Sequence, residues 1–361
     1  MGLYNKQIGG VLVITKVEVN NFKQFESLSL ERMSLINVIA GKNSSGKTTL
    51  LEAIFTNLGR LSADVFIRMF SWRGAEELEM ETKTLIAPFF YKYDLSKTIQ
   101  IKLYDEIDIR DLTIKYNADG NVQAMPQNIP FNTNFISSQL NDRTINGEML
   151  EYTFRFRGKT HQHKLIYGKD QLFFNNGGND VEPKITGFIS TRIGSLNSET
   201  AKFYDNLKIK KIEKDVVKAV QIIEPEIRDI MTSGNKVYFD IGLDEYKPVE
   251  YFGDGVARLM YLVVSIAARK NGLLMIDEIE RGFHYSIHDK VWEVVIKTAK
   301  ANNCQLIITT HSYEILQSLV IAADDLKTDD ITYFKLDNSA KSKRYSIQDL
   351  TIAISNNWEV R

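Results

Sequence analysis

Eight consecutive residues near the N-terminus have the types and spacing needed to hold a phosphate group. Residues 41–48 read GKNSSGKT and match the pattern G-x-x-x-x-G-K-[ST] at every fixed position. Glycines allow backbone N–H groups to curve around a phosphate, and the N-terminus of a following helix favours its negative charge. We therefore expect a nucleotide-binding loop made of Gly41, Asn43, Ser44, Ser45, Gly46, Lys47, Thr48 and Thr49.

Two side chains of this phosphate loop indicate what it binds. Lys47 is expected to reach the β- and γ-phosphates, and the Thr48 hydroxyl is expected to be a Mg²⁺ ligand. The sequence therefore predicts ATP and Mg²⁺ as the ligands of the loop.

A second segment supplies carboxylates. Residues 273–278 read LLMIDE, which is typical of a buried strand that delivers two acids at its carboxyl end, where α/β sheets bind ligands. We expect Asp277 to hold Mg²⁺ and Glu278 to orient or deprotonate the attacking water. An apolar run followed by Asp-Glu is also an ordinary strand end in solvent, and only its pairing with the phosphate loop favours the functional interpretation.

A histidine ends a third apolar run, LIITTHS at residues 306–312. From its position, His311 is a candidate for contact with the γ-phosphate or the attacking water. A histidine that merely ends a strand fits the same residues equally well.

Periodicity places these residues on an α/β fold. Residues 34–40 form a continuous apolar run typical of a buried strand, and apolar residues recur at helical spacing after Thr48. In the last third, we predict strands at residues 273–276, 305–309 and 331–336, and helices at residues 256–268, 286–301 and 313–322. Such alternation predicts a mainly parallel sheet covered by helices.

The middle of the chain has a different pattern. Short β-like runs fill residues 85–190, with turn signals at residues 119–120, 146–147 and 175–178, so we predict an inserted antiparallel lobe. Residues 198–223 have helical spacing. We therefore expect one discontinuous head over residues 11–361, made of a nucleotide-binding lobe (1–60 and 236–361), a β-rich insert (85–190) and a helical lobe (195–235).

Composition excludes several classes of protein. Lys and Arg number 45 against 46 Asp and Glu, so the chain is not coated in positive charge. The basic stretches 208–211 and 341–344 are then either solvated faces or local contacts for nucleic acid. A single Cys excludes a disulfide framework, and Cys304 is expected in the core. The longest apolar run, 259–268, is about half a membrane span, so we expect a cytoplasmic protein without a membrane segment.

Four further pieces of sequence occur in a fixed order around the phosphate loop: NNFKQFESLSL before it, then FGDGVARL, LLMIDEIERGFH and LIITTHS after it. Together they resemble ATPases of the RecF/SMC-like branch of the ABC class, most closely the OLD-like and AAA-15/AAA-21 ATPases of bacterial defence systems. The resemblance covers residues 12–60 and 250–325, and the middle third matches by position only.

The resemblance implies a homodimer that holds two ATP molecules between its subunits. Gly253 and Gly255 match the signature turn that contacts the nucleotide of the partner subunit, although Asp254 between them departs from the usual pattern. An acid beside a phosphate repels it unless the side chain points away. The same resemblance makes His311 the switch histidine, so that Lys47, Glu278 and His311 form the expected catalytic set.

Other matches to these families are weaker. Glu280 and His284 agree with the family pattern E-x-G-L-H-P, and Lys23 matches an element close to the nucleotide. The glutamine loop has no clear counterpart. Gln139 is a candidate by residue type and the segment 190–192 by position.

The function implied is Mg²⁺-dependent ATP hydrolysis with ATP-driven dimerisation, which controls a separate nuclease or toxin in bacterial defence or DNA maintenance. About 50 residues follow His311, too few for a fused nuclease. Two alternatives remain at this stage. An ABC transporter ATPase subunit would co-purify with a membrane protein, and a non-hydrolysing scaffold would bind ATP without turnover.

Overall fold

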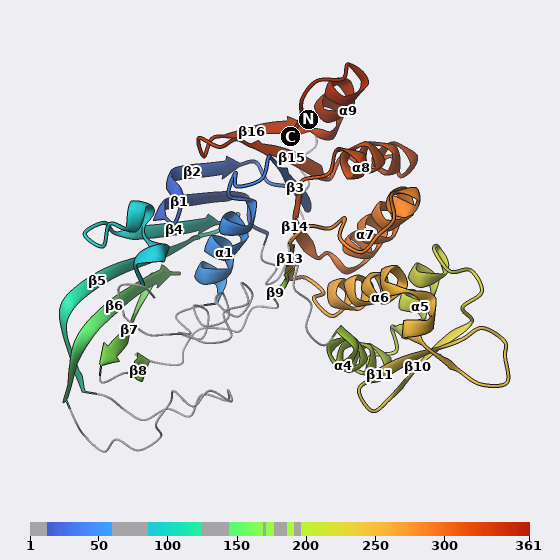
Figure 1. The fold of residues 1–361 in the computed structure, drawn as a ribbon, viewed down its shortest axis with the longest axis horizontal. Coiled ribbons are helices and arrows are strands. Elements are labelled where there is room, and N and C mark those ends of the chain that lie inside the picture. The colour runs from blue at the N-terminus through green and yellow to red at the C-terminus, as the bar shows by residue number, and fades with distance from the viewer. Residues whose placement is uncertain (1–12, 60–85, 124–143, 169–170, 177–185, 191–195) are drawn as a thin grey trace.

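The computed structural model describes residues 13–59, 86–123, 144–168, 171–176, 186–190 and 196–361. In this part of the chain, a central sheet lies between a large antiparallel sheet and a layer of helices (Figure 1). The antiparallel sheet is on the left of the view and the helices are on the right.

The central sheet has six strands, and five of them are parallel. Their order is β16-β15-β3-β14-β13-β9, and only β16 at the edge runs antiparallel to its neighbour. The predicted α/β class with a mainly parallel sheet is therefore confirmed. The bounds of the strands are Ser342–Ser346 (β16), Ile331–Leu336 (β15), Ile36–Ala40 (β3), Gln305–Thr310 (β14), Leu273–Ile276 (β13) and Thr186–Ile189 (β9).

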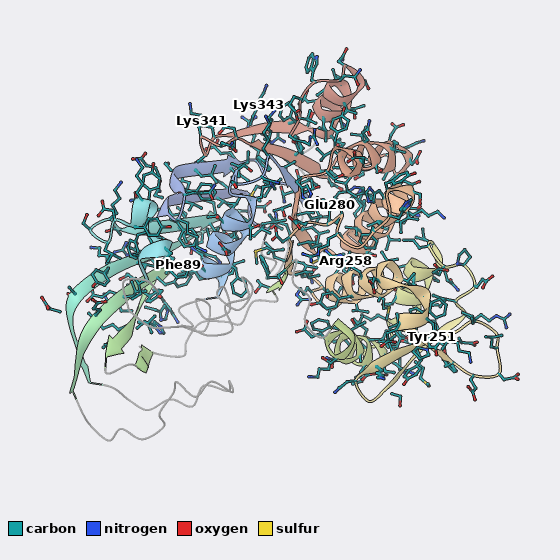
Figure 2. All side chains as sticks on the ribbon, viewed as in Figure 1. Phe89, Tyr251, Arg258, Glu280, Lys341 and Lys343 are labelled. Carbon is teal, nitrogen blue, oxygen red and sulfur yellow. The ribbon has the colours of Figure 1, made fainter. Side chains whose placement is uncertain are left out.

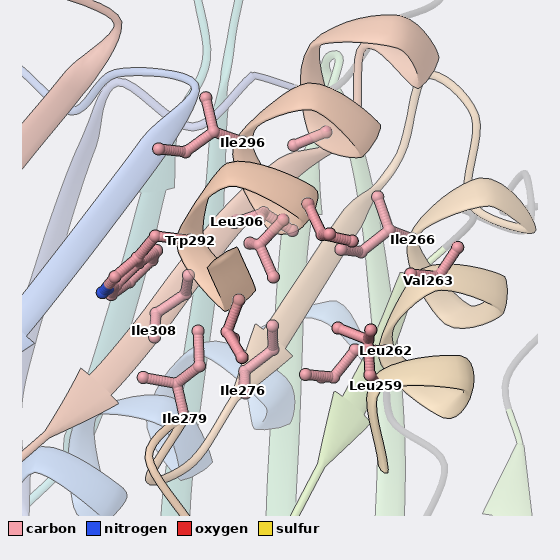
Figure 3. Packing of buried hydrophobic residues seen from close by; sticks show 14 of the residues in the cluster. Leu259, Leu262, Val263, Ile266, Ile276, Ile279, Trp292, Ile296, Leu306 and Ile308 are labelled. Atoms are coloured by element: carbon pink, nitrogen blue, oxygen red, sulfur yellow. The ribbon is translucent and has the colours of Figure 1, made fainter. Parts of the chain in front are cut away.

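Successive residues of the central strands alternate between two hydrophobic cores, because side chains along a strand point to opposite faces. In β13, Leu274 and Ile276 pack with the helices, whereas Leu273 and Met275 pack toward the antiparallel sheet. Figure 3 shows Ile276 among apolar side chains of the helical face. Both faces are covered, which explains why these strands read as continuous apolar runs.

Among the described residues, several helices cover one face of the sheet and one helix covers part of the other (Figure 1). The helix on the second face is α1, which directly follows the phosphate loop. On the first face, the Trp292 indole of α7 donates a hydrogen bond to the Ile315 carbonyl of α8 at 2.8 Å. The bounds are Lys47–Leu58 (α1), Asp254–Ala267 (α6), His288–Asn302 (α7), Tyr313–Asp325 (α8) and Ile347–Ser355 (α9).

The antiparallel sheet includes the N-terminal strands as well as the middle of the chain. Its order is β2-β1-β4-β5-β6-β7-β8, so β1 and β2, which precede the phosphate loop, belong to the same sheet as the strands from the middle of the chain. The bounds are Phe25–Glu31 (β2), Lys16–Phe22 (β1), Ile99–Tyr104 (β4), Ile109–Gln123 (β5), Thr144–Phe156 (β6), Lys159–Gly168 (β7) and Gln171–Asn176 (β8).

Two of the predicted turns in this region are wrong. Gly120 lies inside β5 and Gly147 inside β6, and the two glycines face each other across the pair, where the register shifts after Asn117. A Cβ on Gly120 would stand 2.5 Å from the Met149 Cβ, so a close approach of backbones requires the glycine. The third turn signal, at residues 175–178, falls partly in β8 and partly outside the described residues.

A smaller unit lies beside α6. The helices predicted over residues 198–223 are α4 (Leu196–Ile209) and α5 (Glu213–Gln221). They are followed by a three-stranded antiparallel sheet that the periodicity did not indicate: β10 (Asp229–Ser233), β11 (Lys236–Asp240) and β12 (Lys247–Pro248). Within the described residues, none of the helices has the length and apolar character needed to span a membrane.

Candidate functional site

The phosphate loop leaves the carboxyl end of β3 and enters α1 through Gly46. This residue has φ +99°, a backbone conformation that favours glycine. A Cβ at Gly46 would stand 2.6 Å from both the Gln24 amide nitrogen and the Phe25 ring. Conformation and space therefore both demand the second glycine of the motif.

The Lys47 ammonium lies inside the curve of the loop. Its Nζ donates to the carbonyls of Gly41 at 2.8 Å and Lys42 at 2.9 Å, and the residue is 8% exposed. Burial lowers the pKa of Lys47, and the nearby carboxylates of Asp277 and Glu278 act in the opposite direction. The loop thus presents a cation at its centre.

The other loop residues divide by exposure. Asn43, Ser44 and Thr48 are exposed to solvent, whereas Ser45 and Thr49 are buried. A hydrogen bond from a residue outside the motif also fixes the loop. The amide of Gln24, in the turn between β1 and β2, donates to the Ser44 carbonyl at 3.0 Å. Sequence reasoning missed this residue, because its role depends on a turn from another sheet.

The phosphate loop and the acidic strand end meet through a hydrogen bond. Thr48 Oγ1 donates to Asp277, at 3.0 Å from Oδ2 and 3.2 Å from Oδ1, although 229 positions separate the two residues. The neighbours β3, β14 and β13 of the parallel sheet end at one edge, and this brings the two segments together.

Asp277 is a buried carboxyl group. Burial raises its pKa, and hydrogen bonds donated by Thr309 and Thr48 oppose the rise. Its oxygen set fits Mg²⁺, which prefers oxygen ligands and takes one or two carboxylates together with phosphate oxygens. Among the described residues, no cluster of three or more His, Cys, Asp or Glu could hold a metal ion.

Thr309, in β14, joins the two acids. Its hydroxyl donates to Asp277 Oδ1 at 2.6 Å and accepts the backbone N–H of Glu278 at 2.9 Å. Sequence reasoning missed Thr309 too. The only signal is its position two residues before His311, on the strand that neighbours β13.

Glu278 adopts a left-handed conformation, with φ +50°. Its carbonyl accepts a hydrogen bond from Arg258 Nη2 at 3.0 Å, and its side chain is 35% exposed. Arg258 is buried in α6, and burial lowers its pKa to about 10. The buried Arg258 therefore fixes the backbone of Glu278, while the carboxylate of Glu278 remains partly exposed to solvent.

His311 follows β14 and lies beside the acids. Its Nδ1 is 3.0 Å from Glu280 Oε1 and 3.6 Å from Glu278 Oε1. The three chemical groups expected near the γ-phosphate, Lys47, Glu278 and His311, thus come from one edge of the central sheet.

The turn at residues 253–255 begins α6. Gly253 has φ +83° and precedes the first residue of the helix, Asp254, which is exposed. A Cβ on Gly255 would stand 3.2 Å from the Gly282 carbonyl. The structure therefore packs this turn against the segment that follows Glu278.

Two weaker candidates lie elsewhere. The Lys23 ammonium pairs with Glu52 of α1 at 2.6 Å, and both side chains are almost buried, so this lysine supports the helix. His284 is exposed and its Nδ1 lies 2.9 Å from the Ser286 hydroxyl.

Of the segment 190–192, the structure describes Ser190. It follows β9, whose last carbonyl, that of Ile189, accepts the backbone N–H of Asp277 at 2.9 Å. Ser190 therefore emerges beside the acids. Thr191, Arg192 and the other candidate, Gln139, lie outside the described residues.

Comparisons with known proteins agree with this geometry. The family described as "AAA ATPase domain" matches residues 13–174 and 142–316, which together span most of the chain. The chain belongs to this family. It is therefore an ATPase, and the expected binding and hydrolysis of ATP are confirmed at that level.

Relatives of this AAA ATPase include an "ATP/GTP phosphatase" of Helicobacter pylori, 26% identical over 330 residues, which are 85% of this chain and 87% of the relative. The "DNA replication and repair protein RecF" of Clostridium tetani is 23% identical over 248 residues, 65% of this chain and 59% of the relative. The RecF match confirms the predicted RecF-like, ABC-class resemblance. Among solved structures, the SMC head domain of Thermotoga maritima aligns over 93% of this chain and 99% of its own, with 9% identity and a TM-score of 0.48.

Proposed function

We propose that this ATPase hydrolyses Mg²⁺-bound ATP with Lys47, Glu278 and His311 as its catalytic set. The hydrogen bond between Thr48 and Asp277 carries the proposal, because it brings the phosphate loop and the acids into one site. Thr48 and Asp277 would hold Mg²⁺, which neutralises charge on the β- and γ-phosphates when it is bound.

The chain's own groups then have distinct tasks. The Lys47 ammonium exchanges its carbonyl partners for phosphate oxygens. Glu278 accepts a proton from the attacking water, whose oxygen forms a bond to the γ-phosphorus while the bond to the bridging oxygen of ADP breaks. His311 donates a hydrogen bond to the γ-phosphate and senses its presence.

We further propose a homodimer as the ATP-bound state. The N-terminus of α6 at Gly253 and Gly255 carries free backbone N–H groups, which favour an anion. Asp254 is exposed and begins the helix, so its carboxylate can point away from the partner's nucleotide.

The downstream task is proposed on the family likeness. A separate nuclease or toxin, controlled by closing and opening of the dimer in bacterial defence or DNA maintenance, fits an ATPase of this kind. The RecF relatives, named for DNA replication and repair, support a DNA-related process. Contact with nucleic acid would use the exposed basic stretches 208–211 and 341–344, and Figure 2 shows Lys341 and Lys343 at the top of the molecule.

The proposal is tested by three variants and three assays. Lys47→Ala should abolish ATP binding, measured by calorimetry, and the exposed Lys202→Ala in α4 is the matched control. Glu278→Gln should bind ATP, accumulate as a dimer in size-exclusion chromatography and lose roughly 100-fold or more in phosphate release. Wild-type ATP affinity in Lys47→Ala would refute the assignment of the phosphate loop as the ATP-binding site. If the wild-type protein binds ATP but releases no more phosphate than Glu278→Gln, the result favours the alternative function, a scaffold that binds ATP without hydrolysing it.

A further inference from the structure

Glu280 is a nearly buried carboxylate that the proposed mechanism does not use. It lies two residues after Glu278 at the same edge of the sheet, and its side chain is 10% exposed. Figure 2 labels it near the centre of the molecule, above Arg258. A carboxylate this deeply buried costs free energy unless hydrogen-bond donors face it.

Glu280 accepts a hydrogen bond from the backbone of His311 and lies at ion-pair distance from the ring of the same residue. Oε1 of Glu280 accepts the backbone N–H of His311 at 2.9 Å and lies 3.0 Å from its ring Nδ1. The second oxygen, Oε2, is buried and has no hydrogen-bond partner among the described residues. One oxygen therefore fixes both the backbone and the ring of this histidine.

This contact also determines which ring nitrogen faces the nucleotide. A carboxylate only accepts hydrogen bonds, so a hydrogen on Nδ1 faces Glu280 and Nε2 is left for the nucleotide. The hydrogen bond that His311 donates to a phosphate oxygen then comes from a second hydrogen on Nε2, so the ring carries both hydrogens when it contacts the phosphate. Glu278 competes poorly for the same ring, because its Oε1 is 3.6 Å from Nδ1, beyond hydrogen-bond distance. Glu280 thus keeps His311 away from Glu278, whose carboxylate stays available to water.

We infer that Glu280 is a positioning residue that acts on ATP hydrolysis through His311. The inference rests on the proposed function, since it needs His311 to contact the γ-phosphate. Glu280 itself is not proposed to touch nucleotide or metal. Loss of a group that orients a metal-bound histidine costs about 10- to 100-fold in activity, and we take the lower end for His311, which binds no metal.

A double-mutant cycle separates this role from a merely structural one. ATP turnover and ATP-analogue affinity are measured for wild type, Glu280→Gln, His311→Ala and the double variant. We expect Glu280→Gln to lower kcat about 10-fold with the analogue Kd unchanged within about twofold, and to cause no further loss once His311 is alanine. An equal loss in both backgrounds, or no loss in either, overturns the inference.

Histidine NMR supplies a second readout that is independent of turnover. The chain has five histidines, so the His311 signal in ¹⁵N-histidine protein is assigned by its absence from His311→Ala. Wild type should carry a hydrogen on Nδ1 of His311, and Glu280→Gln should lose that preference. Glu314→Gln, an exposed carboxylate three residues further on, is the matched control and should leave the signal unchanged.

ATP turnover and the NMR signal together distinguish a failure of the proposed role of His311 from a failure of the positioning role of Glu280. If His311→Ala keeps wild-type turnover, the proposed role of His311 fails, and the NMR result still decides whether Glu280 orients the ring. A His311 signal that is identical in wild type and Glu280→Gln overturns the positioning role, whatever the kinetics show.

Discussion

Thr309→Val tests how the two acids of the site are held together. Valine matches threonine in shape, so the change removes the hydroxyl and little else. Two interactions are lost: the 2.6 Å hydrogen bond to the Asp277 carboxylate and the 2.9 Å bond from the backbone N–H of Glu278. The residue is fully buried, so water cannot replace either of them.

The size of the effect follows from the charged partner. A hydrogen bond to a charged group contributes about 1.5–3 kcal/mol, and 1.36 kcal/mol is a factor of ten in rate. We therefore expect Thr309→Val to lower kcat about 10- to 100-fold. Phosphate release under saturating ATP and Mg²⁺ measures it.

The same change should shift the pH dependence. Burial raises the pKa of Asp277, and the Thr309 hydroxyl opposes that rise by stabilising the carboxylate. Removal of the hydroxyl raises this pKa further. Because only the carboxylate binds Mg²⁺, the acid side of the kcat profile should move to higher pH.

Thr310→Val is the matched control. Thr310 is the next residue, equally buried, and its hydroxyl accepts the backbone N–H of Ser312 at 3.1 Å instead of touching an acid. We expect it to lower stability by about 1 kcal/mol and to keep the wild-type pH profile. Equal kinetic losses in both variants, or wild-type kinetics in Thr309→Val, would refute the reasoning.

Three other variants test neighbouring features. Gly46→Ala forces a Cβ to within 2.6 Å of the Phe25 ring at φ +99°, so ATP affinity by calorimetry should fall at least about 10-fold. Arg258→Met removes the hydrogen bond to the Glu278 carbonyl and should lower kcat about 10-fold with ATP affinity unchanged; equal kcat would mean that the bond is dispensable. Asp254→Ala should leave ATP-driven dimerisation unchanged or faster in light scattering, and a complete loss would contradict our interpretation of that turn.

Sequence predicted the parts of this molecule that local patterns encode. Strands β13 and β15 have the predicted bounds, 273–276 and 331–336. All four residues of β13 are apolar and buried, and β15 is buried except at Lys335, which is partly buried. The phosphate loop is also predictable from local sequence, because only glycine tolerates φ +99° at position 46 beside the Phe25 ring.

Features that depend on distant pairing escaped prediction. Gly120 and Gly147 look like turns in sequence, yet they lie opposite each other inside two long strands, at a shift in register. Thr309 and Gln24 are ordinary polar residues until the sheets place them beside Asp277 and the phosphate loop. The only local signal is the position of Thr309 two residues before His311, and Gln24 has none.

The left-handed backbone at Glu278 has a consequence for anyone who makes a trapped form of this protein. A residue with a Cβ at φ +50° is strained by about 1 kcal/mol relative to glycine. The Glu278→Gln variant keeps both the backbone strain and the side-chain volume. The Glu278→Gly variant would release the strain, so it should have a higher melting temperature than wild type. Glu278→Gly is therefore expected to be inactive but more stable than wild type, and it would be a poor mimic of the natural resting enzyme.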